Sequence, residues 1–146
     1  MNTFLQHNYY VLVTVKFFVS FICGFLIGME RQRHNKNAGA RTHLTISLSA
    51  TALMILAIEC FNETNAGDIT RIAAAAIQGM GFLGAGVILH NVKEDQVRVE
   101  GITTAAIMWA TTVVGLCIGF GKFFIGILLT IVMLIISNID TRKKSR

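Results

Sequence analysis

The 146-residue sequence contains no proline and few charged side chains, and both absences narrow its class. Charged residues make up 14% of the chain, whereas a soluble domain carries about a quarter. Hydrophobic residues make up 53%, and the mean hydropathy is +0.61. Little polar sequence remains from which to build a separate soluble domain. The composition predicts an all-α integral membrane protein with a single domain that covers residues 1–146.

The sequence also lacks the motifs of common active sites. It has no GxSxG nucleophile turn, no HExxH metal site and no Walker phosphate loop. Its three cysteines are far apart and include no CxxC pair, which disfavours a disulfide framework and a zinc site. We therefore expect no enzyme, no catalytic residue and no cofactor, and the sequence assigns no metal ligand.

Five apolar segments have the length of a membrane-spanning helix. They cover about residues 11–29, 43–61, 70–90, 102–119 and 121–139. The first ten residues contain no lysine or arginine, so they lack the basic region of a signal peptide, and we expect the first segment to be retained. The last two segments are joined by a very short turn, which predicts an antiparallel helical hairpin.

The positive charges fall mainly on one side of these segments. The loops 30–42 and 91–101 and the tail after residue 139 carry most of the lysines and arginines, whereas the other side has Arg71 and Lys122. The positive-inside rule then places the N-terminus outside and the C-terminus in the cytoplasm. The net charge of +5 is explained by this orientation, and no aromatic-laced basic patch suggests a nucleic-acid partner.

The third segment, RIAAAAIQGMGFLGAGVILH, is unusually thin. Glycine is less favourable than alanine in a helix interior by about 1 kcal/mol, so four glycines in one segment need a reason. Small residues permit close contact between membrane helices, and the alternative is a helix break that lines a polar site. We expect this helix at the centre of the bundle. The candidate residues are Gln78, Gly79, Gly81, Gly84 and Gly86.

Charged residues inside the first two segments allow two interpretations. Lys16 and Glu59 lie at similar depths near the outer side of the predicted membrane. A charge pair between them is possible, and the alternative is that Lys16 extends to the interface while Glu59 reaches water.

Small faces recur on two other segments. Gly24 and Gly28 form a GxxxG motif in the first, and Gly115 and Gly119 form one in the fourth. These faces predict tight packing within the chain or across the interface of a homo-oligomer, with a dimer expected. We interpret Trp109, near the middle of the fourth segment, as a packing anchor.

The loop after the first segment is the most charged part of the chain. It is interpreted as a solvated anchor, with a cytoplasmic docking surface or a cation site as alternatives. Glu30 is its only acid and lies beside Arg31, which makes a poor magnesium site because that ion prefers several oxygen ligands.

Three runs of the chain share their residues and their order with a known family. The runs GFLIGMERQRHNKNAGARTHL, RIAAAAIQGMGFLGAGVIL and GITTAAIMW resemble the first inner loop, the glycine-rich third span and the Gly–Leu–Thr–Thr–Ala–Ala–x–x–Trp element of the MgtC/SapB family. The resemblance covers about residues 15–139. Beyond the third-span glycines, the matching positions include Gly28, Glu30, Arg31, Ala38, Gly39, Arg41, Thr42, Gly101, Thr103, Thr104 and Trp109.

The resemblance implies a multi-pass protein of a bacterial inner membrane with five spans. Members of the MgtC type are linked to growth in low magnesium, to virulence and survival inside phagocytes, and to inhibition of the proton-driven ATP synthase. Many members have a further C-terminal domain of ACT-like fold, and we expect a short, SapB-like member without it. The family commonly has arginine directly before the glycine that here is Gly101, whereas this chain has Glu100.

Two functions follow as hypotheses. The first is a non-enzymatic regulator that acts through helix contacts with itself or with another membrane protein complex. The second is a small oligomeric channel or transporter for a cation such as magnesium.

Overall fold

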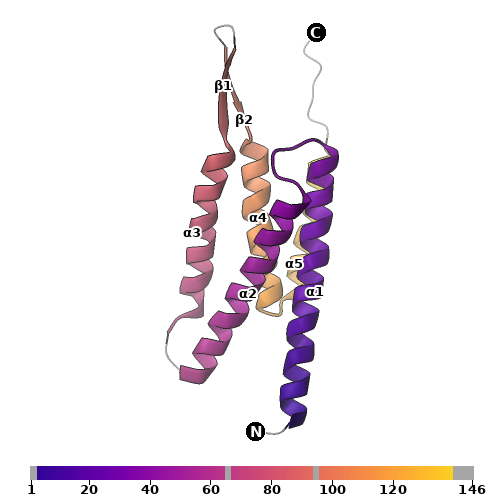
Figure 1. Cartoon of the computed structure of the whole chain (residues 1–146), viewed down its shortest axis with the longest axis vertical. Coiled ribbons are helices and arrows are strands. Elements are labelled where there is room, and N and C mark those ends of the chain that lie inside the picture. The colour runs from indigo at the N-terminus through magenta and orange to yellow at the C-terminus, as the bar shows by residue number, and fades with distance from the viewer. Residues whose placement is uncertain (1–2, 65–66, 94–95, 140–146) are drawn as a thin grey trace.

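The computed structural model describes residues 3–64, 67–93 and 96–139. These residues form five helices, α1 (Thr3–Arg33), α2 (Ala40–Thr64), α3 (Ile69–Val87), α4 (Ile102–Gly119) and α5 (Phe123–Asn138), and a hairpin of β1 (Leu89–Lys93) and β2 (Gln96–Glu100). The helices run alternately up and down one long axis (Figure 1). The predicted all-α class is confirmed apart from the hairpin.

Three of the helices are long and apolar enough to cross a membrane. These segments are His7–Arg33, Ala40–Thr64 and Ile102–Gly119, and α5 is a shorter apolar helix. The helix α3 is not among them, and it combines Arg71 near its start with Gln78 and four glycines further along. The structure therefore supports a membrane protein, with three of the five predicted segments meeting the test by length and composition.

The chain turns at two ends of the bundle. The α1–α2 loop and the β-hairpin lie at one end, and the α2–α3 and α4–α5 connections lie at the other (Figure 1). The first end carries the loops 30–42 and 91–101, whose cations the positive-inside rule assigned to the cytoplasm, and we call it the basic end. The cationic tail after residue 139 lies outside the described residues. Five segments that cross in alternating directions, as the sequence predicted, are consistent with this arrangement.

The centre of the bundle is formed by α2 and α4, so the expectation that α3 would be central is wrong. Figure 1 shows α3 along one side of the bundle, and it packs on α4 and on part of α2. The physical reason lies in the glycines of α1 and α4. These helices present small faces to α2 from both sides, and α2 fills the middle.

The two GxxxG motifs account for this packing. A Cβ atom added at Gly28 would lie 2.5 Å from the Cα of Ala40, and one at Gly24 would lie 2.9 Å from the Cβ of Ser47. On the other side of α2, a Cβ at Gly119 would lie 2.7 Å from the carbonyl oxygen of Thr51. Only glycine permits these backbone approaches, so the predicted close packing occurs within one chain.

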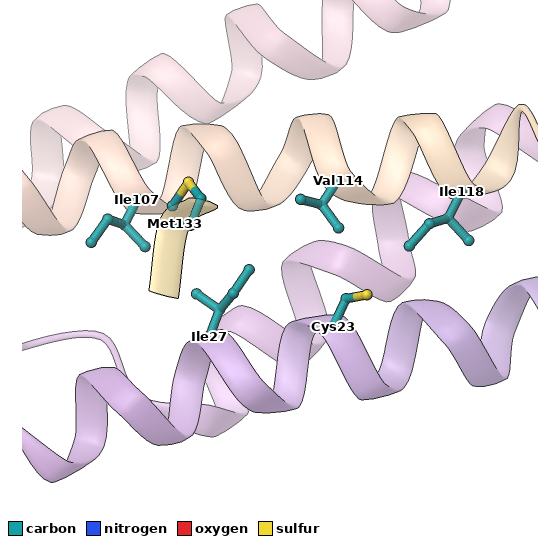
Figure 2. Close-up of a cluster of buried hydrophobic side chains, with 6 residues drawn as sticks. All are labelled: Cys23, Ile27, Ile107, Val114, Ile118 and Met133. Carbon is teal, nitrogen blue, oxygen red and sulfur yellow. The ribbon is translucent and has the colours of Figure 1, made fainter. Parts of the chain in front are cut away.

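A buried apolar cluster joins α1, α4 and α5. Cys23 and Ile27 of α1 face Val114 and Ile118 of α4, and Met133 of α5 closes one end (Figure 2). The thiol of Cys23 is free and buried, and it packs in this cluster as a small apolar side chain.

The β-hairpin replaces the end of the third predicted segment, which was expected to continue to residue 90. The helix α3 stops at Val87, and β1 pairs with β2 in antiparallel register from Leu89 with Glu100 to Lys93 with Gln96. Gly101 ends the hairpin with φ +93°, and a Cβ atom there would overlap the carbonyl oxygen of Val87. Glycine is therefore required at the point where the chain enters α4.

Candidate functional site

The outward face of α3 is the candidate contact surface of this chain. Around Gly79, Gly81 and Gly86, no atom of the described residues lies within 4 Å of the position that a Cβ atom would take. Gln78 is exposed between them, and Phe82 is 82% exposed. We call Gln78, Gly79, Gly81, Phe82 and Gly86 the α3 face.

The other glycine of this helix has a different role. Gly84 is buried, and a Cβ atom there would lie 3.5 Å from the Cβ of Ala105 on α4. This contact fixes α3 to the bundle on the side opposite to the α3 face. The alternative of a helix break is not found, since α3 is one continuous helix, and the exposed Gln78 does not line a cavity among the described residues.

The start of α3 is defined by a capping residue. Asp68 accepts hydrogen bonds from the backbone N–H and the hydroxyl of Thr70, at 2.8 and 2.6 Å. These bonds hold the pKa of the Asp68 carboxyl below its ordinary value. The cap fixes where the helix begins and therefore which residues form the α3 face.

Lys16 does not pair with Glu59. Its Nζ donates a hydrogen bond to the carbonyl oxygen of Gly119 at 2.8 Å, and the ion pairs found among the described residues involve Glu30 with Arg31 and His34. Gly119 is the last residue of α4, so its carbonyl lacks a helical partner and lies at the negative end of the helix dipole. The carbonyl oxygen at the end of α4 is therefore the partner of the Lys16 ammonium group.

A row of buried hydroxyls joins α1, α2 and α4, and the sequence analysis did not identify it as a unit. Ser20 and Ser47 approach to 2.8 Å, and Thr51 lies 2.8 Å from Ser20 while also contacting the carbonyl oxygen of Gly115 at 2.9 Å. All three side chains are fully buried. We call Ser20, Ser47 and Thr51 the hydroxyl row.

The row continues toward the basic end through His43. Thr111 donates its hydroxyl to the carbonyl oxygen of Ile107 at 2.8 Å, so it accepts from Nδ1–H of His43 at 2.9 Å. This assigns the tautomer of His43 and leaves Nε2 as an acceptor. Nε2 is buried without a hydrogen-bond partner among the described residues. The spacing of His43, Ser47 and Thr51, four residues apart, was the available sequence signal.

An ion pair closes the basic end. Arg31 is 2% exposed, and its Nε and Nη2 donate to the carboxylate of Glu30, at 2.5 and 2.7 Å. Its Nη2 also lies 3.4 Å from the carbonyl oxygen of Ser137 on α5. Removing one partner of such a buried pair costs about 3–5 kcal/mol. The interpretation as a solvated anchor is therefore wrong for these two residues, because they join α1 to α5.

The other motif residues of the loop and of α4 are dispersed. Gly39 lies beside the side chain of Gln32, Arg41 is exposed, and Thr42 is half-buried. Thr104 is buried, whereas Thr103 is exposed at the start of α4. Trp109 is 48% exposed, so its interpretation as a packing anchor is wrong within a single chain. These residues form no common site, and the described residues contain no cluster of three His, Cys, Asp or Glu side chains that could hold a metal ion.

Comparison with known proteins gives consistent matches. The MgtC family profile matches residues 17–145. A Haemophilus influenzae protein of uncharacterised function is 35% identical over 132 residues, covering 86% of this chain and 54% of its own. Escherichia coli YhiD, named as a candidate magnesium transporter, is 38% identical over 122 residues, covering 80% and 54%.

A third relative carries the family's own name. The MgtC protein of Brucella abortus is 36% identical over 104 residues, covering 70% of this chain and 40% of its own. The chain thus spans about half the length of the first curated relatives it matches. No solved structure matches it.

Proposed function

The chain belongs to the MgtC family, and we propose that it is a non-enzymatic regulator of a bacterial inner membrane that acts through helix contacts. The proposed topology has five spans, with the N-terminus outside and the basic end in the cytoplasm. The proposed partner is a second copy of the chain, another membrane protein complex, or both.

The observation that carries this proposal is the α3 face. A polar amide among open glycines is unfavourable against lipid, because hydrocarbon neither hydrogen-bonds to Gln78 nor fills the gaps above Gly79, Gly81 and Gly86. A second helix would satisfy both needs. The glycines of α1 and α4 are already used inside the chain, which makes the α3 face the surface that remains for a partner.

The regulatory role proposed here has two further supports. The relatives are named for MgtC and for magnesium transport, which favours a role in adaptation to low magnesium and in virulence. The family resemblance extends this to modulation of the proton-driven ATP synthase. Contact through α3 is the mechanism that we propose for this modulation.

The test is ATP-driven proton pumping in inverted membrane vesicles that contain the protein. We expect reduced pumping with an unchanged passive proton leak. Gly81→Leu should restore pumping, because the new side chain covers the α3 face without meeting other parts of the chain. Ser49→Leu, a similar enlargement at an exposed position of α2, should leave the inhibition intact. Unchanged pumping with inserted wild-type protein would refute the ATP synthase role.

A cation channel or transporter is the second candidate, favoured by the name of YhiD and by the hydroxyl row. Hydroxyls can line a cation path, but Lys16 lies at the end of this row, and its charge repels cations. Magnesium influx into proteoliposomes separates the candidates. Uptake that is lost in Thr51→Val and retained in Gly81→Leu would support the transporter and refute the contact mechanism.

A further inference from the structure

A cleft of about 710 Å³ opens at the basic end between α1, α4 and α5. Its wall combines the end of α1 and the following loop with the first turns of α4 and the last turns of α5. The volume lies in the range of binding sites for small ligands. None of the residues on the α3 face lines it, so it is separate from the proposed contact surface.

One side of the cleft is cationic. Arg31, His34 and Lys36 contribute to its wall, together with the hydroxyl of Thr103 and the amide of Asn138. Glu30 compensates part of this charge through its contacts with Arg31 and His34. No ion pair of Lys36 is found among the described residues, and its side chain is exposed. This side of the cleft therefore presents excess positive charge to a ligand.

The other side is apolar. Ile107 and Met133 are buried at its base, and Ile136 and Ile139 are exposed along it. The cleft lies where the apolar segment of α1 ends, where that of α4 begins, and where α5 ends. In a membrane this is the level of the lipid headgroups, with the apolar side directed toward the acyl chains.

We propose that this cleft binds the headgroup phosphate of an anionic phospholipid. The phosphate lies against the ammonium group of Lys36, with the buried Arg31–Glu30 pair behind it, and the first part of an acyl chain lies along Ile136 and Met133. Guanidinium and ammonium groups are the preferred protein partners of phosphate oxygens. Charge and apolar surface occur side by side in one cleft, which suits an amphiphile better than a free anion.

Native mass spectrometry of the purified full-length chain in a neutral detergent tests this proposal. The probes are phosphatidylglycerol and phosphatidylcholine, which both contain phosphate but differ in net charge. We expect phosphatidylglycerol to bind more tightly. Lys36→Gln should weaken its binding about fivefold, as expected for one juxtamembrane cation. Arg33→Gln removes the same charge from an exposed residue outside the cleft and should change binding less than twofold.

A second pair of variants tests the cavity rather than the charge. Ala106 lies in the wall, so Ala106→Phe should fill the space and weaken phosphatidylglycerol binding at least tenfold. Ser49→Phe, at an exposed position of α2, should not. Arg31 is unsuitable for substitution, because its loss would leave the buried carboxylate of Glu30 with His34 as its one ion-pair partner among the described residues. Circular dichroism confirms that each variant is folded.

Four results would overturn the proposal. The first is equal binding of the two lipids, and the second is equal loss with Lys36→Gln and Arg33→Gln. The third is inorganic phosphate binding that depends on Lys36 while phosphatidylglycerol binding does not, which would assign the cleft to a soluble anion. Retention of phosphatidylglycerol by Ala106→Phe would likewise place the lipid elsewhere.

Discussion

Replacing Gly28 with alanine should separate α1 from α2 and destabilise the bundle. The new Cβ would lie 2.5 Å from the Cα of Ala40, and also 3.0 and 3.1 Å from its nitrogen and oxygen. Ordinary contacts begin at 3.4 Å, so the helices must separate by about 0.9 Å at this point. All three obstructing atoms belong to the backbone, and no side-chain rotation can relieve the contact.

The magnitude follows from comparison with Gly79→Ala. Alanine is better than glycine in a helix interior by about 1 kcal/mol, and this gain is common to both variants. At Gly79 no atom of the part of the chain that the structure describes lies within 4 Å of the new Cβ, so only the gain remains. At Gly28 the overpacking costs about 1–3 kcal/mol. The difference between the two free energies of unfolding therefore isolates the packing cost, and we expect about 1–3 kcal/mol.

The assay is reversible unfolding of the purified chain in mixed micelles, at a protein concentration low enough to keep it monomeric. Circular dichroism reports the helical content as the fraction of denaturing detergent increases. Equal unfolding midpoints for Gly28→Ala and Gly79→Ala would refute the assignment of the GxxxG motif of α1 to an internal contact.

Three further predictions use the same assay. Thr51→Val should lower the free energy of unfolding by about 1–2 kcal/mol, because the carbonyl of Gly115 and the hydroxyl of Ser20 lose a buried partner. The control Thr45→Val, at an exposed position, should lower it by less than about 0.5 kcal/mol. Equal effects would contradict burial of the hydroxyl row. Gly101→Ala should destabilise the chain more than Gly121→Ala, since both glycines have positive φ but only Gly101 is crowded by Val87. The reverse order would contradict the described junction between the hairpin and α4. Exchanging the charges of Lys16 and Glu59 in a double variant should rescue neither single variant, because Lys16 bonds to Gly119; recovery of stability would restore the charge pair.

The helical class and the approximate residue ranges of the five helices followed directly from the sequence. Long apolar segments specify helices because a membrane leaves no other partner for backbone groups, and loop charges separate the two ends. The hairpin was missed because residues 89–100 contain too few apolar positions to distinguish a short ribbon from a loop. Only the positive φ of Gly101, which no composition reveals, marks its end.

The position of α3 could not be predicted for a different reason. Glycines indicate that a helix approaches something closely, but they do not say what. Gly24, Gly28, Gly115 and Gly119 approach α2, whereas Gly81 approaches none of the described residues, although all five lie in helices among other small residues. The candidate residues on α3 were identified correctly as a group that shares a helix, and only the structure showed that most of them point outward. Their role in contact is still a prediction.

The hydroxyl row was missed because its residues give no sign in the sequence of which helices they connect. His43, Ser47 and Thr51 occupy one stripe of α2, but isolated hydroxyls in membrane helices can bond to their own preceding turn, as Thr111 does. Their function as a connection between three helices depends on which faces meet. The glycines of the neighbouring helices determine which faces meet, and their contacts are known only from the structure.

Photo-crosslinking from the α3 face in intact membranes tests the central claim most directly. A small diazirine side chain is placed at Gln78, with Ile135 on α5, which is 60% exposed, as the control position. Our account predicts discrete protein adducts, as a dimer or with another membrane protein, from position 78 only, and their loss when Gly81→Leu is added. Adducts from both positions alike, or labelling of lipid alone from position 78, would contradict it.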